Sequence, residues 1–213
     1  MEMLKTELEE LYKFIKRNWT EAAVISLATL FLLLAKYHPL PNKLISDLLY
    51  YFALPIVSIL LVLRRNPLDF GLRLGNVKIW SAHLLLAFPI IFVIVYWMTS
   101  TSGVQHYYRS PNFNPLHFVV ATGLSLFPWE FIFRGFLLFG LKDRMKETAV
   151  LVQMVPFTLL HLGKPEFETV TCIISGIYFG FVCYRSNSFW PAWLIHQFIS
   201  YSMQFLIIYH FGA

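Results

Sequence analysis

Long apolar runs recur along the whole chain and are separated by short polar links. A run of about 20 apolar residues is long enough to cross the hydrocarbon core of a bilayer as a helix. Lipid offers no hydrogen bonds to the backbone, so separate runs of this length can cross only as helices. We expect seven spans, at roughly 19–36, 44–63, 79–99, 116–141, 148–162, 168–185 and 190–209.

The composition favours an integral membrane protein over a soluble domain. Of the 213 residues, 57% are hydrophobic and only 14% are charged, whereas soluble domains carry about 25% charged residues. The net charge of +5 could suggest a nucleic-acid partner, but no basic patch is interleaved with exposed polar sequence. The predicted fold class is therefore all-α, a polytopic helical membrane bundle that forms a single domain over residues 19–213, and no nucleic-acid partner is expected.

The first 18 residues have a different pattern. Leu4, Leu8, Leu11 and Ile15 recur at helical spacing, with Lys and Glu between them. This pattern is typical of an amphipathic helix that lies along the membrane surface. The segment lacks the apolar core of a signal peptide, so we expect no cleavage.

Three connections between the spans differ in character. Residues 64–78 read as a polar loop with about one turn of structure, and residues 100–115 as a nearly uncharged loop. Residues 142–147 form a charged link.

Small residues mark the sixth predicted span. Cys172, Gly176 and Gly180 recur every four residues and form a ridge that lets a neighbouring helix approach closely. Cys172 and Cys183 lie about three turns apart along the same helix, roughly 16 Å, which is too far for a disulfide. We expect both cysteines to be packing residues.

Polar groups at helical spacing occur in three of the spans. Glu130 precedes Arg134 by four residues, Phe157 precedes His161 by four, and His196 precedes Ser200 by four. Residues four apart lie on one face of a helix. Ionisable groups inside a membrane are costly, so they usually face a protein interior or a wet cavity and mark function.

A carboxylate and two imidazoles are the minimum set for activating a water. Glu130 could be the general base while His161 and His196 orient the water or stabilise an oxyanion. Alternatively, the three could fill three positions of a catalytic zinc site, with water in the fourth. A purely structural interpretation also exists, in which Glu130 and Arg134 form a buried ion pair that fixes helix packing. The catalytic interpretation predicts that the three groups converge on one buried polar cavity.

These three motifs, in this order, resemble those of the CPBP family of intramembrane proteases, the CAAX-protease and bacteriocin-processing family. The family's first motif is two glutamates, three residues and an arginine; here it reads Trp129, Glu130 and then Arg134. The second motif, Phe and His four residues apart, is matched in full by Phe157 and His161. The third, His and Asn or Asp four residues apart, is matched by His196.

Two positions depart from the family pattern. The first glutamate, to which the family's water-activating role is usually assigned, falls on Trp129, and the final Asn or Asp falls on Ser200. The resemblance implies an intramembrane endopeptidase with Glu130, His161 and His196 as catalytic residues. Arg134, Phe157 and Ser200 would support them, and the family is often read as glutamate-dependent without a tightly bound metal.

The departures leave a second class of function open. A chain that has lost the first glutamate could keep the fold and act without catalysis, as a membrane scaffold or an immunity protein. A small transporter is a third interpretation, but an odd number of spans and no internal repeat argue against it. For an enzyme, the expected partners are the lipid bilayer and a membrane-associated peptide or protein, such as a prenylated C-terminus or a bacteriocin-like precursor.

The distribution of basic residues predicts the orientation in a plasma or inner membrane. With a cytoplasmic N-terminus, the inside segments hold 12 Lys or Arg residues and the outside segments hold 4. Cytoplasmic loops carry the excess of positive charge, so we expect the N-terminus inside and the C-terminus outside.

The orientation can be tested with reporters. A reporter fused after Ala213 is expected outside the cytoplasm, and one inserted in the link 142–147 is expected inside, because the charge bias fixes which ends stay in the cytoplasm. Alkaline phosphatase and green fluorescent protein fusions at both positions provide the measurement. The reverse labelling pattern would overturn the orientation.

Overall fold

The computed structural model describes residues 1–110 and 113–211, and these residues form helices and no strand. This confirms the all-α prediction. In chain order the elements are α1 (Glu2–Arg17), α2 (Trp19–Tyr37), α3 (Lys43–Leu48), η1 (Leu49–Ala53), α4 (Leu54–Leu61), η2 (Pro67–Asp69), α5 (Val77–Thr99), α6 (Ser102–Tyr108), α7 (Pro115–Glu130), η3 (Phe131–Leu137), α8 (Leu138–Met145), α9 (Thr148–Leu159), α10 (Glu166–Ser186) and α11 (Trp190–Tyr209).

Five helical segments among the described residues are long and apolar enough to cross a membrane. They are Trp19–Tyr37, Lys43–Leu61, Val77–Thr99, Pro115–Met145 and Glu166–Ser186. The second of these runs through α3, η1 and α4, and the fourth runs through α7, η3 and α8. The chain is therefore an integral membrane protein with several helices able to span the bilayer.

The two remaining predicted spans are also helices, but they do not meet the same criteria. α9 has only 12 residues, and α11 carries His, Gln, Ser and Pro among its apolar residues. The crossing of the membrane by α9 and α11, and hence the total of seven spans, stays a prediction.

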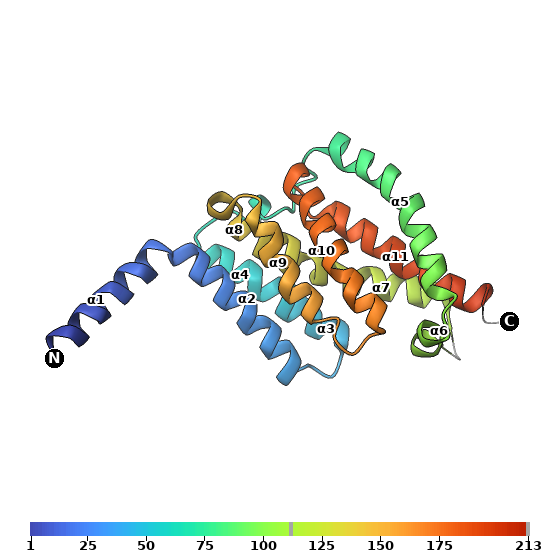
Figure 1. Ribbon diagram of the computed structural model, residues 1–213, viewed down its shortest axis with the longest axis horizontal. Coiled ribbons are helices and arrows are strands. Elements are labelled where there is room, and N and C mark those ends of the chain that lie inside the picture. Colours follow the sequence, from blue (N-terminus) through green and yellow to red (C-terminus); the bar gives the residue numbers. More distant parts are fainter. Residues whose placement is uncertain (111–112, 212–213) are drawn as a thin grey trace.

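The first helix stands apart from the bundle. α1 contains no buried residue, and Figure 1 shows it projecting away from the other helices. It is helical over almost the whole segment predicted to be amphipathic. Its position on the membrane surface stays a prediction.

The centre of the bundle is the continuous helix formed by α7, η3 and α8. All seven residues of η3 are buried, including Arg134. η3 is a π-helical segment, a widened turn that occurs in helices most often at functional sites. It begins directly after Glu130 and contains Arg134, so the first polar motif extends from the end of α7 into the widened turn.

Two of the predicted connections need correction. Residues 100–115 contain the helix α6, because Val104 is buried against Val95, Met203 and Ile207. A single apolar residue in a polar segment gives no periodic signal, so the sequence did not indicate this helix. The link 142–147 is also shorter than predicted, since α8 continues to Met145 and ends only where Lys146 takes a positive φ of 51°. By contrast, one turn of helix, η2, lies in the loop 64–78 as predicted.

The small-residue ridge on α10 faces α9. A Cβ atom on Gly176 would lie 3.0 Å from Met154, and one on Gly180 would lie 2.5 Å from the side chain of Gln153. The two helices can therefore approach closely only because these positions are glycines. Cys172 and Cys183 are free and buried, which confirms that they form no disulfide with each other.

One end of the bundle is held by the loop before α5. The backbone N–H of Asn76 donates to the Ser186 carbonyl at 2.7 Å, and that of Phe189 donates to the Gly71 carbonyl at 3.0 Å. The loop thereby ties the start of α5 to the turn between α10 and α11. Gly75 lies at the closest approach, with a φ of +61°.

We predict that Gly75→Ala destabilises the protein. The new Cβ would lie 2.1 Å from the Ser186 carbonyl oxygen, in a backbone conformation that favours glycine. A strained residue of this kind costs about 1–3 kcal/mol, which corresponds to a fall in Tm of roughly 2–12 °C for a chain of this length. Thermal unfolding of the detergent-purified protein measures the change. Gly103→Ala is the control, because a Cβ there meets nothing within 4 Å, and a Tm loss shared by both variants would contradict the explanation.

Candidate active site

The first polar motif forms a fully buried ion pair. Arg134 Nη1 lies 3.2 Å from Glu130 Oε2, and both side chains are 0% exposed. The guanidinium carbon also lies 3.9 Å from the ring centre of Phe157 and 5.2 Å from that of Phe179. A buried cation is tolerated when an opposite charge and aromatic faces surround it. Glu130 and the two rings supply both conditions.

The second oxygen of Glu130 binds a histidine from a different helix. His196 Nδ1 on α11 lies 2.6 Å from Glu130 Oε1 on α7. A carboxylate oxygen accepts, so Nδ1 donates and the proton is placed on that nitrogen. In the neutral ring, the Nε2 atom of His196 then carries a lone pair. A carboxylate that orients an imidazole in this way is a recurrent arrangement in hydrolytic enzymes.

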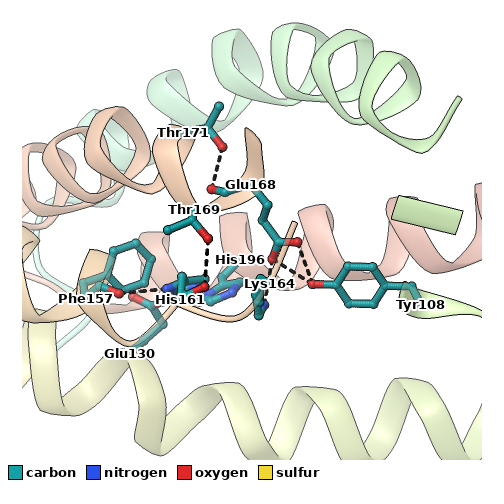
Figure 2. A network of polar contacts seen from close by, with 9 residues as sticks. All are labelled: Tyr108, Glu130, Phe157, His161, Lys164, Glu168, Thr169, Thr171 and His196. Carbon is teal, nitrogen blue, oxygen red and sulfur yellow. Dashed lines mark hydrogen bonds and ion pairs between the residues drawn. The ribbon is translucent and has the colours of Figure 1, made fainter. Parts of the chain in front are cut away.

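His161 is oriented by its own helix end. It lies in the turn after α9, and its Nδ1 is 2.8 Å from the carbonyl oxygen of Phe157. A carbonyl can only accept, so Nδ1 carries the proton and Nε2 again has a free lone pair. The His161 and His196 rings lie 6.5 Å apart, between centroids, and at 30° to each other. Figure 2 shows the two rings side by side, next to Glu130 and Phe157.

Both histidines face a cavity of about 340 Å³ between α5, α9, α10 and α11. Most of its wall is aliphatic, from residues such as Leu86, Ile90, Ile199 and Met203. Glu130 is not among the lining residues and lies behind His196. The three predicted groups are thus close together, but the cavity is largely apolar rather than polar. The Glu130 carboxylate does not contact the cavity itself, because the His196 ring lies between them.

The two positions that depart from the family pattern lie near these groups. Trp129 meets the edge of the His161 ring at 5.8 Å between centroids, and its Nε1 is buried with no hydrogen-bond partner among the described residues. Ser200 lies one turn beyond His196 on α11. The indole therefore occupies space next to His161 where a glutamate at position 129 would place a carboxylate.

The donors do not fit the zinc site that the sequence left open. No group of three His, Cys, Asp or Glu side chains within the described residues is arranged to hold a metal ion. Glu130 Oε1 is bonded to His196, Glu130 Oε2 faces Arg134 at 3.2 Å in an ion pair without a hydrogen bond, and Glu130 does not line the cavity that the two histidines face. The carboxylate is therefore not free to act as a third zinc ligand beside the two histidines.

A second polar network, which the sequence motifs did not predict, lies at the α6 end of the cavity. The Tyr108 hydroxyl donates to Glu168 at 2.7 Å and 2.8 Å, and Lys164 Nζ lies 2.7 Å from Glu168 Oε1. Burial and the nearby Glu168 carboxylate raise the pKa of Tyr108, so its hydroxyl stays protonated and donates. Glu168 also lines the cavity. The only sequence signal was the charged run after His161, which has no periodicity that points to Tyr108.

A further buried carboxylate was also missed. Asp47 on α3 is 6% exposed, pairs with Lys43, and accepts a hydrogen bond of 2.9 Å from the Ser125 hydroxyl on α7. A charged residue early in an apolar span was the signal that could have found it. Its contacts tie α3 to the central helix.

Comparison with known proteins gives one family. The sequence model described as type II CAAX prenyl endopeptidase Rce1-like matches residues 111–202, a little under half of the chain. No curated protein and no solved structure matches. The matched segment contains all three polar motifs, from Trp129 to Ser200. Over this segment the chain is similar to the CAAX-protease family that these motifs resemble.

Proposed function

We propose that the protein is an intramembrane endopeptidase that cleaves a membrane-associated peptide or protein with an activated water. The observation that carries the proposal is the bond between Glu130 and His196, with the Nε2 atoms of His196 and His161 left as acceptors beside one cavity. The match of residues 111–202 to a protease family supports the same reaction class.

Two acceptors beside one cavity can hold one water. The water would donate one hydrogen to His161 Nε2 and the other to His196 Nε2, which leaves an oxygen lone pair for attack on a carbonyl carbon. As the new C–O bond forms, His196 Nε2 takes the proton of the water. The buried Glu130 carboxylate stabilises the resulting imidazolium, because it lies 2.6 Å from Nδ1.

This assignment differs from the one drawn from the sequence. There, Glu130 was the direct base; in the geometry its carboxylate is 0% exposed and does not line the cavity. We propose that Glu130 acts through His196, and that Arg134 holds the carboxylate in place. His196 then returns the proton to the leaving amine when the C–N bond breaks, whereas Ser200, the position the sequence offered as a supporting group, does not line the cavity and is given no role in this step.

The cavity indicates the substrate class. Its aliphatic wall suits an apolar chain, and Leu86, Ile90, Ile94 and Ile174 of that wall are at least 43% exposed on the outside of the bundle. An apolar substrate could therefore enter sideways from lipid. The matching family is described as type II CAAX prenyl endopeptidase Rce1-like. We propose a prenylated C-terminal peptide as the first substrate to test.

We predict that Glu130→Gln lowers cleavage by at least about 100-fold. Glutamine keeps the size of the side chain but cannot stabilise a charged imidazole. The assay is cleavage of a fluorogenic farnesylated CAAX peptide by the protein in liposomes. Some loss of stability is expected as well, because Arg134 loses its charge partner.

Glu166→Gln is the matched control, since it makes the same chemical change at an exposed position in the first turn of α10. Its activity should equal that of the unmodified protein. If Glu130→Gln leaves a folded protein with undiminished cleavage, the proposed mechanism fails. If neither the Glu130→Gln variant nor the unmodified protein cleaves but both bind the peptide, a non-catalytic binding role takes the place of the protease.

A second prediction concerns Trp129, which meets the edge of His161. Trp129→Glu places a carboxylate beside that ring and gives the held water a second base, so we expect cleavage to rise by about tenfold or more. The same fluorogenic assay measures the change. Trp129→Gln is the control, because glutamine has nearly the same size as glutamate but cannot act as a base. An equal rise in both variants would mean that removal of the bulky indole, and not the new carboxylate, is responsible.

A further inference from the structure

The cavity is bounded by two different kinds of surface. On one side its wall is aliphatic, and Leu86, Ile90 and Ile174 of that wall are exposed on helices that are able to span a membrane. At the α6 end its wall contains Glu168, the only Asp, Glu, Lys or Arg among the described lining residues. Hydrolysis consumes water, and an aliphatic wall facing hydrocarbon offers water no hydrogen bonds. The supply of water is therefore expected to come from the Glu168 end.

The helix α6 packs beside that end, although no residue of α6 is among the described lining residues. Val104 of α6 is buried against Val95 and Met203, two residues that line the cavity from α5 and α11. Tyr108, the last residue of α6, reaches across to α10 and donates to both oxygens of Glu168. Figure 2 shows the Tyr108 side chain directed at the carboxylate of Glu168. The Gln204 amide on α11 also donates to the Tyr108 carbonyl at 3.3 Å.

Polar groups continue from Glu168 to His161. Lys164 pairs with Glu168, and its backbone N–H donates to the His161 carbonyl at 3.1 Å. The Thr169 hydroxyl donates to the same carbonyl at 2.8 Å. The Lys164 side chain is 32% exposed, whereas that of Glu168 is 13% exposed. Side-chain exposure thus decreases from Lys164 to Glu168 and then to His161, which is the order expected of a passage that leads inward from water.

We propose that Glu168, Lys164 and Tyr108 form the water entrance of the cavity, and that the Tyr108 to Glu168 hydrogen bond is its latch. While the bond is made, α6 stays docked over the cavity end; when it breaks, water passes Glu168 and reaches the two histidines. The proposal rests on the proposed function in one respect only, that the water admitted is the one consumed by hydrolysis. The access itself can be measured without cleavage.

Cys172 is a native reporter of this passage. It lines the cavity one turn beyond Glu168 on α10 and is 5% exposed. Cys183 is 0% exposed and does not line the cavity, so Cys183→Ala leaves Cys172 as the single thiol. The protein in lipid nanodiscs, where both membrane faces are accessible, is treated with a permanently charged methanethiosulfonate reagent or with lipid-permeant N-ethylmaleimide. Mass spectrometry gives the rate of labelling at Cys172 by each reagent.

We expect Tyr108→Phe to speed labelling by the charged reagent by roughly tenfold, because it removes the hydrogen bonds to a charged acceptor. Labelling by N-ethylmaleimide, which can also enter from lipid, should change much less. Tyr107→Phe is the matched control, since Tyr107 is a neighbouring tyrosine of α6 that is 50% exposed. It should leave both rates unchanged.

Further variants keep the test decisive. Glu168→Gln weakens the same latch from the other side and should also speed charged labelling. T171C in a cysteine-free background provides a second reporter, because Thr171 also lines the cavity.

Equal rates of labelling by the charged reagent in the Tyr108→Phe, Glu168→Gln and unmodified proteins would overturn the latch. No charged labelling of either reporter in any variant overturns the water entrance. The Glu130→Gln variant should be labelled at the same rates as the protein without this change. A loss of cleavage in that variant therefore leaves the labelling result unaffected.

Discussion

The buried pair of Glu130 and Arg134 is the interaction on which the rest of the arrangement depends. Neither charge could remain in this apolar core alone, because an unpaired buried ion costs several kcal/mol. Each charge therefore requires neighbours. Arg134 lies against Phe157 and near Phe179, and Glu130 Oε1 accepts a hydrogen bond from His196. The pair thus brings α9, α10 and α11 to the central helix and sets the position of both rings at the cavity.

Much of the fold could be predicted from the sequence, because a backbone in hydrocarbon has to make its hydrogen bonds internally and therefore forms helices. Each predicted apolar span is a helix within a few residues of its expected limits. Glu130 and Arg134 pair as predicted, since residues four apart share a helix face. These are local rules, and they hold whatever the helices pack against.

The parts that could not be predicted depend on contacts between distant residues. His196 and Glu130 are 66 residues apart in the chain. No periodicity in the sequence therefore indicates that His196 Nδ1 bonds to a Glu130 oxygen. Tyr108 lies in a segment with no repeating pattern, and its partner Glu168 is 60 residues away. The apolar cavity is likewise a property of four helices together. Sequence motifs could therefore identify the candidate groups, but they could not separate the residues that face the cavity from the carboxylate behind them.

The shortness of α9 has a consequence for the surrounding membrane. Twelve residues of helix extend about 18 Å, against a hydrocarbon core of about 30 Å. α9 also rests on the glycines of α10, so its depth is set by that longer neighbour. Lipids beside it would have to compress, because the bilayer thins next to a hydrophobic wall that is too short. The protein would then carry a local dimple in the membrane over the turn that holds His161, and headgroups and a polar peptide segment could approach the site without crossing the full thickness of the bilayer.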